Sequence, residues 1–167
     1  TATSSLNKLT NDLIFYYEKG LRANKIGIPV GIFSGSSLPQ NVECYYYNLE
    51  TGNASKILLM EAFDAVAKAF NGVSFDGNNG GEGWGSYLQF LNALSNGINL
   101  DADINQTFSD AIDALEDLDD DLMNQIITDE LQVRAAFDKV QRGTVLLKTD
   151  MLGYLNIDVD YLDADGD

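Results

Sequence analysis

The chemistry that this chain could carry depends on carboxylates and phenols, because the sequence has 26 acidic residues and 8 tyrosines but no histidine. The densest combination is a short run in which Glu43 precedes three consecutive tyrosines. In an extended segment alternate side chains point to opposite sides, so Glu43, Tyr45 and Tyr47 would share one face. This face could bind a ligand or could form the rim of a core, and the pattern allows both.

The absence of histidine removes several classes of site from this chain. Ser-His and Cys-His catalysis, the HExxH zinc motif and every histidine-ligated metal site need a residue that the chain lacks. The single cysteine, Cys44, lies among apolar and aromatic residues, so we predict a buried and inert thiol without a disulfide partner. No complete catalytic motif is therefore expected within the 167 residues.

Two runs of aspartate are candidate metal-binding sites. The run at 117–121 precedes a segment with helical spacing, where carboxylates stabilise a helix N-terminus, so capping is the simpler interpretation and a metal site the alternative. The C-terminal run at 158–167 fails the register of a calcium loop. If Gly166 is its sixth position, the chain ends before the glutamate of its twelfth. A solvated acidic terminus is the preferred interpretation there.

The net charge of -16 constrains the partners. Such a chain repels polyanions, which argues against nucleic acid and anionic lipid surfaces and favours cations, metal ions included. The alternative is that the charge only keeps the surface solvated. No apolar stretch approaches the roughly 20 residues that span a bilayer, so no transmembrane segment is predicted.

Three aromatic residues follow a glycine-rich stretch and could together present a surface to a sugar or a peptide. Tyr87 and Phe90 fit the inward face of a helix, so we predict that both belong to the core. For Trp84, which lies among glycines, the pattern allows either a buried or an exposed side chain.

The spacing of apolar residues predicts an all-α fold, an antiparallel helical bundle with long irregular loops and a short extended C-terminal tail, in one domain over 1–167. Ser4 or Ser5, Asn53 and Asp129 stand where helix N-caps are expected. Gly143 is a predicted weak point of the last helix, and 157–161 alternates like a β-strand. The expected helices cover 5–23, 53–70, 87–94, 101–117, a short segment around 122–126, and 129–154.

Between the first two helices, a long loop at 24–51 holds both prolines, and loops of this length are often functional. Two segments of this loop look like the middle of imelysin-like proteins: Lys25-Ile-Gly-Ile-Pro-Val-Gly-Ile-Phe-Ser-Gly35 and Leu38-Pro-Gln-Asn-Val-Glu-Cys-Tyr-Tyr-Tyr47. The long last helix and the ending from Met151 to Asp-Gly-Asp167 resemble imelysin-like lipoproteins of the Bacteroides type. The resemblance covers essentially the whole chain.

This resemblance implies a two-domain α-helical protein of the bacterial cell envelope, periplasmic or lipid-anchored at the outer membrane, linked to iron uptake and historically classed as a peptidase. The chain would be its C-terminal half. The Gly-x-His-x-x-Glu motif of the family belongs to the other half, and no histidine here can match it. The implied site lies between the halves, and this half would contribute Lys25, Ser34, Glu43 and Tyr46. Glu43 would ligate iron or another divalent metal or accept a hydrogen bond, and Ser34 and Tyr46 would orient it or contact a ligand.

Three functions follow as hypotheses. The leading one is a binding module for a ligand or a metal, linked to iron uptake, with the missing N-terminal half as partner. The second is part of a metallopeptidase whose metal ligands lie in that missing half, so that this chain alone would have no activity. The third is a structural or interaction domain without a ligand.

Overall fold

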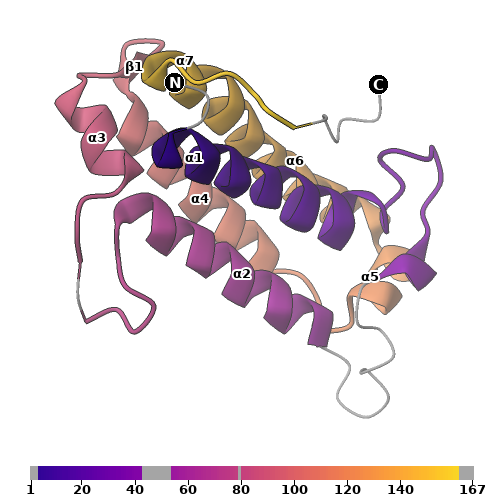
Figure 1. Cartoon of the computed structure of the whole chain (residues 1–167). Helices are drawn as coiled ribbons and strands as arrows, with labels where there is room; N and C mark the ends of the chain where they lie inside the picture. Colours follow the sequence, from indigo (N-terminus) through magenta and orange to yellow (C-terminus); the bar gives the residue numbers. More distant parts are fainter. Residues whose placement is uncertain (1–3, 43–53, 79, 162–167) are drawn as a thin grey trace.

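The computed structural model describes residues 4–42, 54–78 and 80–161, and the fold is all-α as predicted. Four long helices lie side by side, and each runs opposite to the one before it (Figure 1). The first of them packs against both α2 and α6, which closes the bundle. These are the first helix, made of α1 (Ser5–Phe15) and the π-helical η1 (Tyr16–Gly27); α2 (Ala54–Asn71); α4 (Leu100–Glu116); and the last helix, made of α6 (Glu130–Val145), the π-helical η4 (Leu146–Met151) and α7 (Leu152–Leu155).

Shorter elements connect the long helices at the two ends of the bundle. The elements are η2 (Pro39–Asn41), α3 (Trp84–Phe90), the antiparallel pair β1 (Leu94–Ser95) and β2 (Ile98–Asn99), and α5 (Leu122–Thr128). Among the described residues, no helix is long and apolar enough to cross a membrane.

Side-chain caps begin two helices where the sequence predicts them, and the third predicted cap, Asn53, lies outside the described residues. Ser4 accepts a hydrogen bond from the backbone N–H of Asn7 at 3.2 Å, and Asp129 accepts one from Gln132 at 3.4 Å. Asp121, in the aspartate run, accepts one from Asn124 at 3.0 Å at the start of α5. The capping interpretation of this run is thus confirmed for Asp121.

Two predicted helix ends were wrong. The first helix does not stop near residue 23 but continues as π-helix to Gly27, because Ile26 packs into the core at 2 % exposure. Helix α3 ends at Phe90 rather than near Leu94. Asn92 adopts a left-handed conformation (φ 50°) just after it, which an L-residue inside a helix does not adopt. Leu94 then pairs with Asn99 in the hairpin.

The end of the chain also differs from the prediction. The described part of the predicted extended tail makes no strand and runs along the first helix instead. The amide of Asn11 donates to the Asp158 carbonyl at 3.1 Å, and its oxygen accepts from the Asp160 N–H at 3.2 Å. One side chain thus satisfies backbone groups that a neighbouring strand would otherwise pair with.

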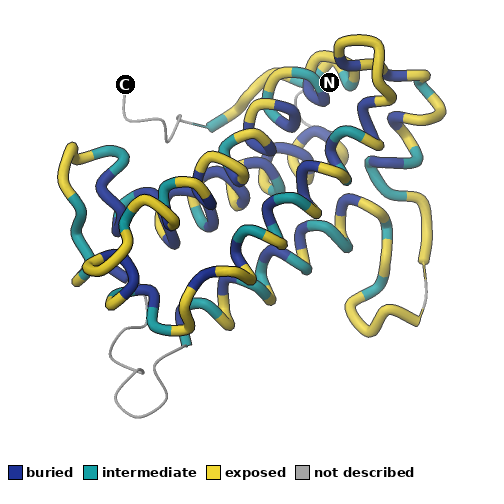
Figure 2. The backbone as a smooth tube through the Cα atoms, turned by 180° about the vertical axis from the view of Figure 1, so that it is seen from behind, coloured by how far each residue is buried: buried dark blue, intermediate teal, exposed yellow. Residues whose placement is uncertain are grey.

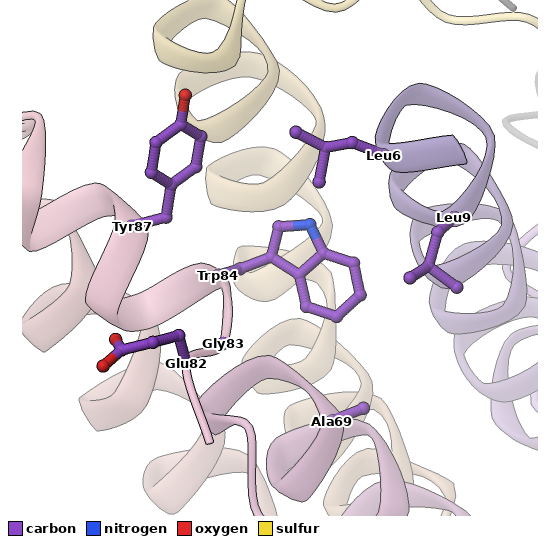
Figure 3. A pocket seen from close by; sticks show the side chains of 7 residues that line it. All are labelled: Leu6, Leu9, Ala69, Glu82, Gly83, Trp84 and Tyr87. Carbon is purple, nitrogen blue, oxygen red and sulfur yellow. The ribbon is translucent and has the colours of Figure 1, made fainter. Parts of the chain in front are cut away.

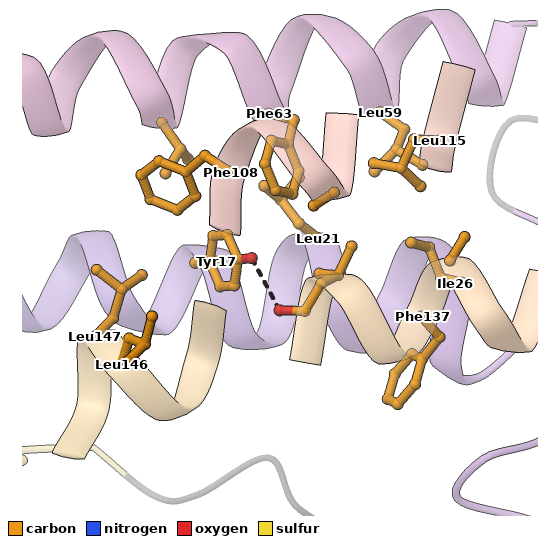
Figure 4. Packing of buried hydrophobic residues seen from close by; sticks show 14 of the residues in the cluster. Tyr17, Leu21, Ile26, Leu59, Phe63, Phe108, Leu115, Phe137, Leu146 and Leu147 are labelled. Carbon is orange, nitrogen blue, oxygen red and sulfur yellow. Dashed lines mark hydrogen bonds between the residues drawn. The ribbon is translucent and has the colours of Figure 1, made fainter. Parts of the chain in front are cut away.

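Aromatic residues form the centre of the bundle (Figure 4). The ring of Tyr17 lies 5.5 Å from that of Phe63, and Phe108 contacts Phe70 edge to face at 5.6 Å. Buried positions face inward along all four long helices, and exposed positions face outward (Figure 2). The middle of the first helix is therefore joined to α2 and α4 by close contacts of the Tyr17 ring with Phe63 and Phe108.

Candidate functional site

The structure describes two of the four residues implied by the family resemblance. Lys25 lies on η1 at 9 % exposure and lines a pocket. Ser34 is exposed in the turn that follows, where its hydroxyl donates to the Ser36 carbonyl at 2.8 Å, and it does not line that pocket. Glu43 and Tyr46 lie outside the described residues. Within the described ranges, no three His, Cys, Asp or Glu side chains gather as they would to hold a metal ion.

A buried charge cluster that the sequence analysis missed lies on the other side of η1. The carboxylate of Glu18 is completely buried, and one oxygen accepts from Lys148 at 3.2 Å and from Arg22 at 3.5 Å. Its other oxygen accepts from the Tyr161 hydroxyl at 3.1 Å. Arg22 also donates to Gln141 at 2.5 Å. A buried carboxylate is tolerated only when it is paired and hydrogen-bonded in this way.

The cluster joins two unusual helical segments. Glu18 belongs to η1 and Lys148 to η4, and both segments are π-helical, a rare winding that is frequent at functional sites. The guanidinium of Arg22 also lies over the Phe33 and Phe137 rings, at 5.4 and 6.0 Å from their centroids. All these contacts join one part of the fold to another. We therefore interpret the cluster as a structural network of ion pairs and hydrogen bonds that holds the first helix, the last helix and the tail together.

An apolar groove opens where α1, α2 and α3 meet (Figure 3). Its volume is about 560 Å³, within the range of small-molecule and peptide sites. The indole of Trp84 lies in the middle, Tyr87 on one side and the α1 leucines on the other, while the Glu82 carboxylate is turned away. We call it the α1–α2–α3 groove, and its main lining residues are Leu6, Leu9, Ala69, Glu82, Trp84 and Tyr87.

A close backbone approach and a hydrogen bond build this groove. A Cβ atom at Gly83 would overlap the backbone of Phe70 and Gly72, so only glycine lets the chain pass so close to the end of α2. Trp84 follows at once, and its indole N–H donates to the Thr10 hydroxyl of α1 at 2.9 Å. The indole is thereby held in one orientation between α1 and α3.

The predicted burial of Tyr87 and Phe90 was wrong. Their side chains are 41 % and 78 % exposed, and their rings stack on each other at 6.4 Å. The helix that carries them is short, and its inward face is taken by Leu88, which is fully buried. Trp84, which the sequence left open, packs partly against the core and partly lines the groove.

A second hollow lies farther along the same pair of helices. It measures about 600 Å³, and we call it the Lys25 pocket. Residues from η1, from α2 and from the loop after α2 line it, among them Tyr16, Asn24, Lys25, Leu58, Glu61 and Phe75. A smaller hollow of about 420 Å³ on the flank of α2 shares Glu61 and Phe75 with it.

Phe75 is the most exposed large apolar side chain among the described residues, at 91 %. It sits on a loop held by a β-bridge between Val73 and Gly80 and by the Asp76 carboxylate, which accepts from the Ser74 hydroxyl and the Asn78 N–H. These bonds lower the pKa of Asp76 to about 2, with the Ser74 bond the largest cause. The loop therefore presents the ring beside the pocket from a stable turn.

No protein-family model, curated protein or solved structure matches this chain in the three comparisons made.

Proposed function

We propose that this chain is a binding module that receives an amphipathic helix of a partner domain in the α1–α2–α3 groove. The observation that carries the proposal is the apolar lining of this groove. Leu6 and Leu9 are 44 % and 57 % exposed there, opposite the fixed indole of Trp84. Contiguous apolar surface of this kind on a folded domain usually marks an interaction site.

The shape of the groove favours a helix as its occupant. Ala69 forms part of the lining, and Ala65, one turn earlier on α2, is also exposed. Small residues between larger ones leave a channel into which a helix can place side chains at positions i, i+3 and i+7. The stacked rings of Tyr87 and Phe90 extend the apolar surface at one end.

The acidic residues near the groove favour a basic partner helix. One acidic side chain, Glu82, lies at the rim of the groove, and exposed acidic residues, Asp12 on α1 and Glu61 on α2, lie elsewhere on two of the helices that form it. A partner helix with an apolar stripe and flanking Lys or Arg residues would complement them. A second copy of this chain would bring another charge of -16 to the interface, so self-association is disfavoured.

The resemblance to imelysin-like proteins supports a wider form of the same proposal. In that form the partner helix belongs to the N-terminal half of a two-domain envelope protein, and the link to iron uptake belongs to the whole protein. The metal-binding role would then need Glu43 together with ligands from that half.

Trp84 is the single tryptophan and reports on the groove directly. We would titrate the protein with a leucine- and lysine-containing amphipathic peptide of about 18 residues, some 27 Å as a helix, and with a scrambled peptide of equal composition. Only the amphipathic peptide should bind, with a blue shift of the emission. Leu9→Asp should abolish this binding. Leu131→Asp, which changes an exposed leucine outside the groove, should preserve it. The proposal would be disproved if the wild type bound both peptides equally, or if the Leu9→Asp variant bound the amphipathic peptide as tightly as the wild type does.

A further inference from the structure

We propose that Asn96, at the tip of the β1–β2 hairpin, is a site of spontaneous deamidation, and that the isoaspartate formed there loosens the hairpin. Asn71, which stands in the same local sequence, is protected by the fold. Neither residue lines the α1–α2–α3 groove, so this chemistry is independent of the proposed function.

Deamidation at an Asn-Gly pair needs only the chain itself and water. The backbone nitrogen of the glycine loses its proton to base and attacks the side-chain carbonyl carbon of the asparagine. A new C–N bond closes a succinimide ring, the bond to the side-chain nitrogen breaks, and that nitrogen takes up a proton and leaves as ammonia. Water then opens the ring at either carbonyl, which yields aspartate or isoaspartate. Glycine favours the reaction because it has no side chain to hinder the attack.

The local sequence is nearly the same at the two asparagines. Each is followed by glycine and then by a β-branched residue, in Asn71-Gly-Val73 and Asn96-Gly-Ile98. Both asparagines are exposed to solvent. Asn79, in a third Asn-Gly pair, lies outside the described residues. Sequence and solvent access therefore predict similar reactivity for Asn71 and Asn96, and only their hydrogen bonds and packing distinguish them.

The side chain of Asn71 is held away from the nitrogen that would attack it. Its amide donates to the Ala67 carbonyl at 2.9 Å and to the side-chain oxygen of Asn105 at 2.8 Å, and its own oxygen accepts from Asn105 at 3.2 Å. The Gly72 N–H donates to the Ala69 carbonyl at 3.2 Å, and other backbone crowds this glycine so closely that a Cβ would overlap it. Both reacting groups are thus fixed at the end of α2.

At Asn96 the described structure provides no such restraint. Asn96 and Gly97 form the tip of the hairpin with φ of 49° and 83°, the positive values of a type I′ turn. No hydrogen bond among the described residues involves the Asn96 side chain or the Gly97 N–H, and a Cβ at Gly97 would meet no atom within 4 Å. Each strand has only 2 residues, and so short a hairpin opens locally at little cost. The Asn96 amide can then turn onto the Gly97 nitrogen.

Isoaspartate at this position would break the pairing of the two strands. Its main chain runs through the former side-chain carbon and is longer by one carbon atom, so Ser95 and Ile98 no longer face each other. The outer end of the hairpin stays attached, because the Tyr154 hydroxyl accepts from the Leu94 N–H at 3.0 Å and donates to the Leu94 carbonyl at 2.9 Å. The loss of order is therefore confined to the tip.

The test is incubation of the whole chain in mildly alkaline buffer, followed by peptide mapping with mass spectrometry that separates asparagine, aspartate and isoaspartate. We expect at least about tenfold more conversion at Asn96 than at Asn71 in the folded protein. In concentrated urea, where the fold is absent, the two sites should react at similar rates. Equal conversion in the folded protein, or a difference that persists in urea, would overturn the proposal.

Asn96→Asp is the matched variant for the effect on the hairpin. It carries the charge of the product on an ordinary backbone, and Asp-Gly fits the same type of turn. Freshly prepared Asn96→Asp should therefore exchange its hairpin amide hydrogens like the wild type, whereas incubated protein enriched in isoaspartate should exchange them faster. Equal exchange in these two samples would show that isoaspartate does not loosen the hairpin.

Discussion

The hydroxyl of Tyr17 fills the space that a side chain at position 143 would need. It also donates a hydrogen bond of 2.9 Å to the Val140 carbonyl, one turn before Gly143 on the last helix. The glycine that looks like a weak point in the helical pattern is therefore the place where the last helix leaves room for the Tyr17 side chain of the first helix. The fully buried phenol of Tyr17 joins the two at the centre of the bundle.

Gly143→Ala should lower the free energy of unfolding by about 1–3 kcal/mol, because the added methyl would overlap the Tyr17 phenol. Alanine would otherwise be favoured over glycine in a helix by about 0.5–1 kcal/mol. Gly153 is the matched control, since it is helical and a Cβ there would meet no atom within 4 Å. Urea unfolding should show Gly153→Ala slightly more stable than the wild type. A Gly143→Ala protein as stable as that control would contradict the packing argument.

Burial raises the pKa of Tyr17 well above its ordinary value of 10.0, and the nearby Arg22 charge lowers it by less. The unfolded chain would ionise this phenol near pH 10, whereas the folded chain keeps it neutral. Stability from this group is thus present below about pH 10 and lost as the pH rises beyond it. Thermal unfolding at a series of pH values should show a shallower alkaline loss for Tyr17→Phe than for the wild type. Parallel curves would show that Tyr17 does not cause the loss.

Glu18→Gln should cost about 3 kcal/mol or more, because removing one charge from a buried ion cluster leaves Arg22 and Lys148 without their anionic partner at that position. Asp64→Asn, which breaks the exposed ion pair with Lys68, is the control and should change stability little. Chemical unfolding of both variants checks the prediction. If both variants show the same small loss in the free energy of unfolding, Glu18 does not hold the first helix to η4.

Asn11→Ala should release the C-terminal tail while the bundle stays folded. The substitution removes both hydrogen bonds that Asn11 makes to the backbone of Asp158 and Asp160. We expect faster limited proteolysis after Asn156 and a loss of stability of about 1–3 kcal/mol. Asn105→Ala, whose side chain bonds Asn71 and its own helix on another face, should leave the cleavage rate of the tail unchanged. Equal protection of the tail in Asn11→Ala would mean that other contacts hold it.

Local sequence signals predicted the helical elements well, because helical periodicity and caps act over three or four residues. Leu59, Phe63, Val66 and Phe70 recur on one face of α2, and all four are buried. The errors fell where a distant residue decides the outcome. Ile26 extends the first helix by packing into the core, and Asn11 holds the tail away from any strand.

The candidate site was less predictable. The resemblance pointed to Lys25, which the structure places at a pocket, and to Ser34, which it places in an exposed turn away from that pocket. The roles of Glu43 and Tyr46 stay predictions, since both lie outside the described residues. Glu18 carried no signal, because a glutamate four residues before an arginine is typical of an exposed helical ion pair.

The sequence by itself determined the all-α class, most helix boundaries and the acidic surface, since these depend on composition and on spacing within one turn of helix. Only the tertiary structure decided which side chains meet. The burial of Glu18 beside Lys148, the groove between Leu9 and Trp84, and the contact of Tyr17 with Gly143 each join residues far apart in the chain. Such pairings follow from how whole helices pack against one another, and no local pattern encodes that packing.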